Sequence, residues 1–187
     1  MELEINYQHL SYSKEYYKNL GYVYKELDWI IPKKYIEYTY KEYNKYTLSD
    51  NSLLGSAEQV FIKEMIENDL NGKFQCITPC FRNDVIDELH QEYFMKNELF
   101  FRDGSLSFKE NLIHLEQVIL DAKTFFIKIS KEDCEVIETS KNCYDILLNN
   151  IEVGSYGIRQ IEDLYYIYGT GLAEPRFSVA LHKNKGE

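Results

Sequence analysis

The chain has 187 residues, with 21 basic against 31 acidic side chains and a formal net charge of −10. This length suits one domain, and 44% hydrophobic residues can build a core, which excludes disordered and fibrous classes. An acidic chain is a poor general binder of nucleic acid, because phosphate affinity comes mostly from Lys and Arg. No apolar run suits a membrane span, and the N-terminus is unlike a secretory signal. We therefore expect one cytoplasmic domain over residues 1–187 without membrane contact.

The first fifty residues are unusually rich in Tyr and Lys. Such a surface could stack RNA bases, although half-buried helical packing is the better explanation for the tyrosines. Further on, Ser56-Ala57-Glu58-Gln59 has the form of a capping box and is followed by apolar residues at helical spacing. These features predict a helix that ends at Gly72. Strands are predicted over 74–80 and 93–100.

The second half of the chain mixes helix and hairpin signals. A second capping box, Ser107 to Glu110, predicts a helix, and the β-branched and aromatic run over 124–129 predicts a strand. Strands over 144–148 and 151–153 are joined by Asn149-Asn150, a pair that tolerates a tight hairpin turn. A last strand is predicted over 164–168 and a terminal helix from Pro175. Together these elements predict an α+β fold, an antiparallel sheet flanked by helices.

The first chemically unusual segment runs from Cys80 to Asp84 and continues from His90 to Glu98. Strand side chains alternate, so Phe94, Lys96 and Glu98 share one face. If the two strands form a hairpin, the guanidinium of Arg82 can approach an aromatic ring and carboxylates. A guanidinium fork with a flat ring suits a nucleotide. The alternative is an exposed hairpin with ordinary cross-strand pairs.

The second segment surrounds the predicted Asn149-Asn150 turn. With a two-residue turn, Leu147 pairs with Glu152 and Asp145 pairs with Gly154, so Asp145 and Glu152 lie on one face. Two close carboxylates repel each other unless a cation intervenes, and hard oxygen ligands suit Mg²⁺ bound together with phosphates. The alternative is two solvated acids on a hairpin.

The third segment, Gly169 to Arg176, places small residues after a strand and an arginine at the start of a helix. Small residues let another group approach the backbone closely. The alternative is a simple strand-to-helix turn. The three segments in one chain are stronger evidence of a site than any one of them alone.

These segments resemble the class II aminoacyl-tRNA synthetases. Residues 81–84 and 90–98 resemble motif 2 of that family, and residues 169–176 resemble motif 3, closest to the seryl type. Residues 145–159 resemble the aspartyl and asparaginyl types, and residues 56–58 resemble the loop that holds the amino acid. The similarity runs from about residue 53 to residue 181 in the family's order.

The resemblance implies an ATP site that requires Mg²⁺. Arg82 would hold the α-phosphate and stabilise the charge that develops there, while Arg176 would clamp the γ-phosphate, so these two arginines are the candidate catalytic residues. Phe94 would stack on adenine. The remaining candidate ligands are Asp84 and His90 for ATP, and Asp145 with Glu152 for the metal.

The resemblance also implies an amino-acid site. Ser56 belongs to the loop that holds the amino acid, Glu58 would meet the substrate's α-amino group together with Glu98, and Arg159 matches a position that reads the side chain. An acidic or amide amino acid is therefore expected. Such chemistry needs no protein nucleophile, because positioning and charge neutralisation suffice.

The chain also departs from the family. Motif 1, which forms the family's dimer interface, is degraded within residues 1–50. Gly21 and Pro32 of that motif are nevertheless present, and on the resemblance we expect a homodimer. No stretch is left for an anticodon-binding domain. We therefore expect an adenylate-forming amino-acid ligase whose acceptor is a carrier protein, a small amine or another macromolecule. The alternatives are a stripped synthetase paralogue that acts on tRNA and a non-catalytic paralogue that binds ATP or an amino acid. The acidic, apolar loop over 85–89 is a poor match to RNA phosphates.

Overall fold

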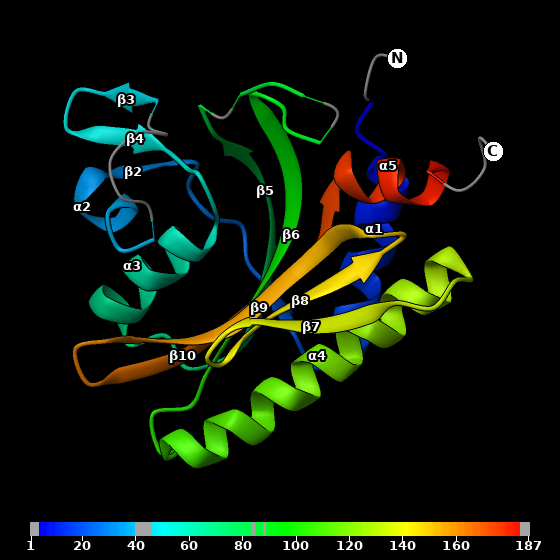
Figure 1. Cartoon of the computed structure of the whole chain (residues 1–187). Helices are drawn as coiled ribbons and strands as arrows, with labels where there is room; N and C mark the ends of the chain where they lie inside the picture. Colours follow the sequence, from blue (N-terminus) through cyan, green and yellow to red (C-terminus); the bar gives the residue numbers. More distant parts are fainter. Residues whose placement is uncertain (1–3, 40–45, 84, 88, 184–187) are drawn as a thin grey trace.

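A computed structural model describes residues 4–39, 46–83, 85–87 and 89–183, and its centre is a seven-stranded sheet (Figure 1). The strand order is β1-β5-β6-β10-β9-β8-β7; β1 is parallel to β5, and all other neighbours are antiparallel. The predicted α+β class is confirmed. The strands are β1 (Val23–Tyr24), β5 (Gly72–Phe81), β6 (Tyr93–Arg102), β7 (Glu135–Ser140), β8 (Cys143–Leu148), β9 (Ile151–Ile161) and β10 (Leu164–Glu174).

Helices cover the two faces of this sheet unequally. One face carries α1 (Tyr7–Asn19), α4 (Phe108–Ser130) and α5 (Arg176–His182). The other face carries α3 (Glu58–Asn68) and α2 (Lys33–Ile36) beside a small sheet of β2 (Ile30–Pro32), β4 (Asn51–Leu53) and β3 (Thr47–Leu48). Figure 1 shows these last elements grouped at one side, so part of that face stays open. Among the described residues, no helix is long and apolar enough to cross a membrane.

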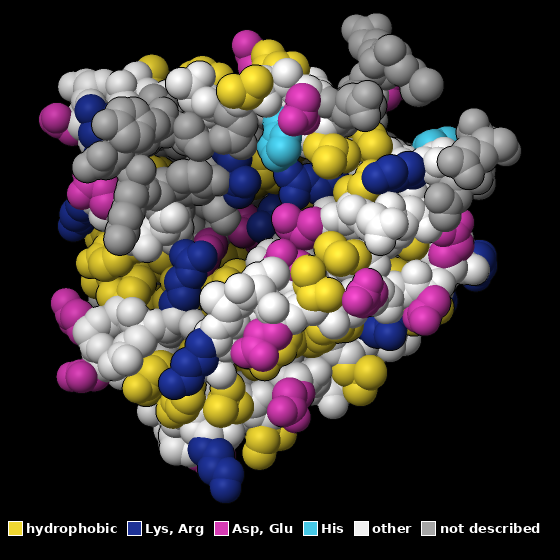
Figure 2. All heavy atoms as spheres, in the orientation of Figure 1, with side chains coloured by type: hydrophobic (Ala, Val, Ile, Leu, Met, Phe, Trp, Pro, Cys, Tyr) yellow, Lys and Arg dark blue, Asp and Glu magenta, His cyan; other side chains and the backbone are white. Residues whose placement is uncertain are grey.

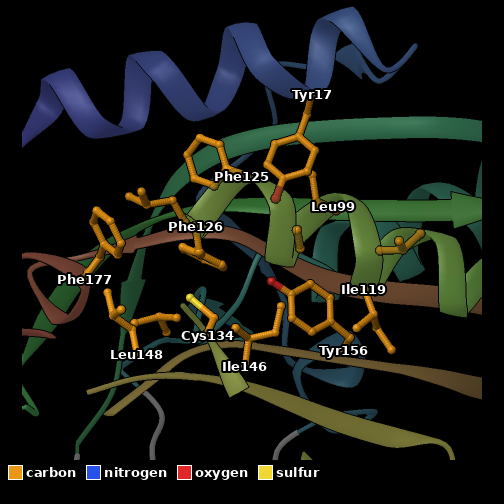
Figure 3. Close-up of a cluster of buried hydrophobic side chains, with 14 of the residues drawn as sticks. Tyr17, Leu99, Ile119, Phe125, Phe126, Cys134, Ile146, Leu148, Tyr156 and Phe177 are labelled. Atoms are coloured by element: carbon orange, nitrogen blue, oxygen red, sulfur yellow. The ribbon is translucent and has the colours of Figure 1, made fainter. Parts of the chain in front are cut away.

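Strand alternation divides the buried residues between two cores. On the α1–α4 face, Tyr17, Phe126, Tyr156 and Phe177 are fully buried and surround the inward face of α4 (Figure 3). On the opposite face, the rings of Phe61, Phe100 and Tyr166 stack at centroid distances of 5.1 and 5.4 Å. Leu99 and Phe101, which flank Phe100 in β6, belong to the first core. The central strands therefore pack against a core on each side, whereas the edge strand β7 is largely exposed.

Both predicted hairpins are confirmed. β5 pairs with β6 in one uninterrupted register that places Cys80 opposite Phe94. Asn149 and Asn150 have φ values of 53° and 60°, the left-handed conformation that a tight turn between β8 and β9 requires. The predicted pairing of Leu147 with Glu152 is confirmed, whereas the pairing of Asp145 with Gly154 is wrong. A bulge after Ile146 shifts the register, so Asp145 lies opposite Ser155.

Two helix boundaries differ from the prediction. The α3 helix begins after Ala57, one residue later than predicted. Gln59 Oε1 accepts the Ser56 backbone N–H at 3.3 Å, as in one half of a capping box, while the Ser56 hydroxyl donates to Glu98 and accepts from the Glu58 backbone at 3.4 Å. The same helix ends before Asp69, whose φ of 48° supplies the left-handed stop, and Gly72 starts β5. The capping box of Ser107 and Glu110 is confirmed, and Pro175 is the residue before α5.

The predicted strand over 124–129 is wrong, because these residues form the second half of α4. Their β-branched and aromatic composition favours a strand locally, but Phe125 and Phe126 continue the buried face begun by Leu115 and Ala122. Burial of that continuous helical face outweighs a local preference worth at most about 1 kcal/mol per residue.

Polar side chains buried in the sheet hold α1 in place. The Asn97 amide donates to Ser13 Oγ at 2.8 Å and to Gln75 Oε1 at 3.0 Å, and the Gln75 amide donates to the Lys14 carbonyl at 2.9 Å. Asn97, Ser13 and Gln75 are all fully buried. A buried polar group that loses its partner costs more free energy than an exposed one.

Replacing Asn97 by Ala should therefore lower the free energy of unfolding by about 2–3 kcal/mol, because Ser13 and Gln75 lose a buried donor. Urea unfolding measures the change. Asn68→Ala, at an exposed residue that bonds only locally to Glu64, is the matched control and should leave the midpoint unchanged. Equal midpoints for Asn97→Ala and the wild type would contradict this role.

Candidate active site

The open part of the sheet holds a cavity of about 370 Å³. Figure 2 shows Lys and Arg side chains gathered in a hollow at the centre of this face, with acidic side chains beside them. Among the described residues, four basic side chains line the cavity against two acidic ones, Glu58 and Glu152, although the whole chain is acidic. Three of the four arginines in the sequence are among them. The basic residues are Arg82, Lys96, Arg159 and Arg176.

One end of the cavity combines an aromatic ring with a guanidinium. Phe94 lines the cavity and shares one face of β6 with Lys96, and Arg82 follows the last residue of β5. The Arg82 guanidinium carbon lies 5.0 Å from the Phe94 ring centroid, and its Nε donates to the Gly55 carbonyl at 3.3 Å. His90 lines the same end, and its Nδ1 contacts the Asp87 carboxylate at 2.8 Å.

The C-terminal segment contributes a second arginine. Arg176, the first residue of α5, pairs its Nη1 with Glu152 Oε2 at 3.3 Å. Asp145 lies on the same face, opposite Ser155 in the neighbouring strand. Burial raises the pKa of Asp145, and the charge of Glu152 raises it further. The two carboxylates therefore repel each other, as expected for a site that accepts a cation.

Another part of the cavity wall is built around a buried carboxylate. Glu58, in the first turn of α3, accepts a hydrogen bond from the Tyr166 hydroxyl at 2.9 Å and pairs with Arg159 Nη1 at 3.2 Å. The Arg159 guanidinium lies over the Tyr168 ring at 4.5 Å. Burial raises the pKa of Glu58 although Arg159 opposes the shift. Arg159 keeps 37% of its side chain exposed, so part of its fork faces the cavity.

A second buried carboxylate, Glu98, supports the floor. It accepts hydrogen bonds from the Ser56 hydroxyl and the Ala57 backbone, and Lys96 Nζ lies 3.0 Å from its Oε1. Burial alone would raise the pKa of Glu98, but Lys96 and the hydrogen bonds more than offset it, and the pKa lies below the ordinary value. Glu98 is therefore a carboxylate that fixes the loop before α3 against β6.

The structure brings most of the predicted site residues together. Glu98 lies under the floor beside Ser56, and Asp145 lies on the same face next to the cavity. Asp84 lies outside the described residues. The predicted residues that line the cavity are Ser56, Glu58, Arg82, His90, Phe94, Glu152, Arg159 and Arg176.

Sequence reasoning missed several side chains of the site. The alternation that places Phe94 and Glu98 on one face of the strand also places Lys96 there, but the sequence did not indicate a function for Lys96. Tyr166 and Tyr168 look like ordinary strand aromatics in sequence, and only the pairing of β10 with β9 brings them to Arg159. Gln59 accepts from the Gly55 and Ser56 backbone and donates to Thr39, so it holds the loop before α3. The rarity of arginine could have indicated these site residues, because most positive charges of this chain are lysines.

Asp145 and Glu152 fit a magnesium ion that is bound partly by the protein and partly by phosphate oxygens. Among the described residues, no group of three or more His, Cys, Asp or Glu side chains is placed to hold a metal by itself. Asp145 and Glu152 are two hard oxygen donors on neighbouring strands. Magnesium is commonly bound by one or two carboxylates together with substrate phosphates and water, which agrees with this donor set.

The fold and site can now be compared with known proteins. The family description "tRNA synthetases class II core domain (F)" matches residues 26–175, and the chain belongs to this family. No curated protein sequence matches the chain.

Among solved structures, the chain is similar to seryl-tRNA synthetase from Pyrococcus horikoshii complexed with ATP, with a TM-score of 0.76 and 17% identity over 96% of this chain. It spans 51% of that enzyme. Two pyrrolysyl-tRNA synthetase structures from Desulfitobacterium hafniense match with TM-scores of 0.70 and 0.72 at 13% and 14% identity. Each match covers 96% of this chain, and the chain spans 69% and 68% of them. Identities this low show the shared fold alone.

The Glu98 arrangement gives a testable pH dependence. Because the folded-state pKa of Glu98 is depressed, its stabilising effect is fully present above the ordinary value of 4.5 and is lost as the pH falls through the folded-state pKa. Glu98→Gln leaves buried Lys96 without its carboxylate and should lower the unfolding free energy at pH 7 by about 3 kcal/mol. The difference from wild type should shrink below pH 4.5.

Urea unfolding of both proteins at pH 7 and at successively lower pH tests this. Glu15→Gln, which breaks an exposed pair with Lys18, is the control and should match the wild type throughout. A Glu98→Gln penalty that stays constant from pH 7 into the acid range would show that the carboxylate charge is not the stabilising feature.

Proposed function

We propose that the protein uses ATP and Mg²⁺ to activate an amino acid as an aminoacyl adenylate and is thus an adenylate-forming ligase. The observation that carries this proposal is the excess of basic side chains among the described residues of one cavity in an acidic chain, together with an aromatic ring and a buried carboxylate in the same lining. Positive charge with a stacking ring suits a polyphosphate nucleotide, and Glu58 suits an ammonium group.

The chemistry requires positioning and charge stabilisation. An oxygen of the amino-acid carboxylate attacks the α-phosphorus, the bond to the bridging oxygen breaks, and pyrophosphate leaves with its electron pair. Arg82 holds the α-phosphate and stabilises the charge that develops in the transition state, and Arg176 holds the γ-phosphate. Phe94 stacks on adenine. Asp145 and Glu152 hold Mg²⁺, which neutralises phosphate charge when bound.

Arg159 is the proposed reader of the substrate side chain. Its guanidinium is held by Glu58 on one side and by the Tyr168 ring beneath it, while part of it faces the cavity. A planar fork in a fixed orientation recognises a carboxylate or an amide oxygen better than a flexible ammonium does. This supports an acidic or amide amino acid as the substrate.

The proposed acceptor is a carrier protein, a small amine or another macromolecule in preference to a full tRNA. A second hollow of about 660 Å³ shares Gln91 and Pro175 with the first. Its charged lining residues, among those described, are Glu4 and Glu92, and its apolar ones include Tyr7 and Ile86. A surface of this kind repels RNA phosphates. We also propose that the protein forms a homodimer and acts in the cytoplasm.

Replacing Arg82 by Ala should reduce adenylate formation by at least about 100-fold, because the developing negative charge loses its guanidinium. Trapping the activated acyl group with hydroxylamine, at saturating ATP and amino acid, measures this step directly. Arg82→Lys keeps the positive charge without the planar guanidinium, and its rate of adenylate formation should lie between those of the wild type and Arg82→Ala. Wild-type rates in Arg82→Ala would refute the assignment, provided that the wild type forms hydroxamate.

Replacing Arg159 by Ala should change which amino acid is accepted more than it changes ATP binding. The effect on the preferred amino acid should be about 10-fold to 1,000-fold in kcat/KM, since a charged hydrogen bond is lost. Comparing Kd for ATP with kcat/KM across amino acids separates the two effects. A collapse of ATP affinity with an unchanged amino-acid preference would place Arg159 at the nucleotide instead.

A further inference from the structure

A buried pair links the first helix to the segment that carries Arg176. His9 Nδ1 in α1 lies 2.6 Å from Glu174 Oε1 at the end of β10, across 165 residues of sequence. The Glu174 side chain is fully buried, and that of His9 is 18% exposed. The edge of the His9 ring also meets Phe177 at 5.2 Å with an interplanar angle of 81°. His9 therefore contacts the residues on both sides of Pro175 and Arg176.

The hydrogen-bond partners of His9 define one arrangement of its ring. Asn6, the N-cap of α1, places its amide nitrogen 3.3 Å from His9 Nε2. An amide nitrogen only donates, so Nε2 accepts, and Nδ1–H donates to the Glu174 carboxylate. This neutral tautomer satisfies both ring nitrogens. The ring is held from two sides and cannot rotate without leaving Glu174 without this donor.

The helix that carries His9 is itself fixed to the sheet. The Tyr17 hydroxyl donates to the Gly171 carbonyl at 3.4 Å, and Asn97 bonds Ser13. Gly171 is the extra residue of a bulge in β10, and a Cβ there would lie 2.9 Å from Asn97 Nδ2 and 3.0 Å from Tyr17. The close contact therefore requires glycine. Residues near both ends of α1 thus contact the end of β10, at Gly171 and at Glu174, and only Pro175 separates Glu174 from Arg176.

We propose that His9 is a positioning residue for Arg176, so that α1 sets the affinity of the site for the polyphosphate end of ATP. The inference rests on the proposed role of Arg176 at the γ-phosphate. Glu174 and Phe177 are buried, whereas the Arg176 side chain reaches Glu152 at the rim. The side chain and backbone of Ser178 also hydrogen-bond Glu174, so loss of the His9 donor leaves this buried carboxylate with fewer partners and favours its movement toward water or toward a new partner. Either movement displaces the adjoining Pro175–Arg176 backbone.

Comparison of ATP with AMP tests this inference. AMP lacks the β- and γ-phosphates and does not reach Arg176, so its Kd reports on the rest of the site. His9→Phe keeps the ring against Phe177 and removes the donor; it should weaken ATP binding about fivefold to tenfold and leave AMP binding unchanged. His9→Asn, whose amide lies near the Nδ1 position, should restore ATP affinity. Titration calorimetry measures both ligands.

Two further variants make the result decisive. Arg176→Ala should lose affinity for ATP and not for AMP, and His182→Asn, at an exposed histidine that bonds only locally to Ser178, should match the wild type. The positioning role is overturned if Arg176→Ala weakens ATP binding alone and His9→Phe has no such effect. It is also overturned if His9→Phe weakens the binding of ATP and AMP equally. If Arg176→Ala shows no selective loss, the proposed γ-phosphate contact fails and the inference fails with it. Should His9→Phe not fold, His9→Gln replaces it, because its amide reaches toward the Nε2 position.

Discussion

The site depends on cation–carboxylate pairs that are already formed before any ligand arrives. Lys96 lies against Glu98, Arg159 against Glu58 and Arg176 against Glu152. Unpaired, these charges would repel one another and lose hydration in a partly buried cavity. Held in pairs, they can face one hollow at fixed positions. Phosphate and carboxylate groups of a ligand can then bind guanidinium groups that are already oriented, which is the electrostatic preorganisation that adenylate formation needs.

The sheet places these pairs through simple alternation. Phe94, Lys96 and Glu98 face the open side because each is two residues from the next in β6, while the residues between them are buried toward α1 and α4. That part of the site was predictable, as were the β5–β6 hairpin and the turn at Asn149. The small sheet and α3 then cover one end, and the loop before α3 carries Ser56 and Glu58 to the cavity.

The features that sequence alone did not predict arise from tertiary contacts. The bulge after Ile146 moves Asp145 from Gly154 to Ser155, and no local pattern marks it. The residues over 124–129 are helical because Phe126 packs in the core, against their local preference for a strand. The Ser56 hydroxyl, at the start of α3, also donates to a carboxylate 42 residues away. His9 looks isolated in sequence, since its partner Glu174 follows 165 residues later.

Activation of an amino acid by ATP is reversible, so the exchange of pyrophosphate into ATP measures it without any acceptor. The protein is incubated with ATP, Mg²⁺ and labelled pyrophosphate, with each of the twenty amino acids in turn and without tRNA. Our account predicts label incorporation into ATP that depends on one amino acid, acidic or amide, and is absent in Arg82→Ala. Binding of ATP without exchange for any amino acid would contradict activation and favour a non-catalytic nucleotide-binding role.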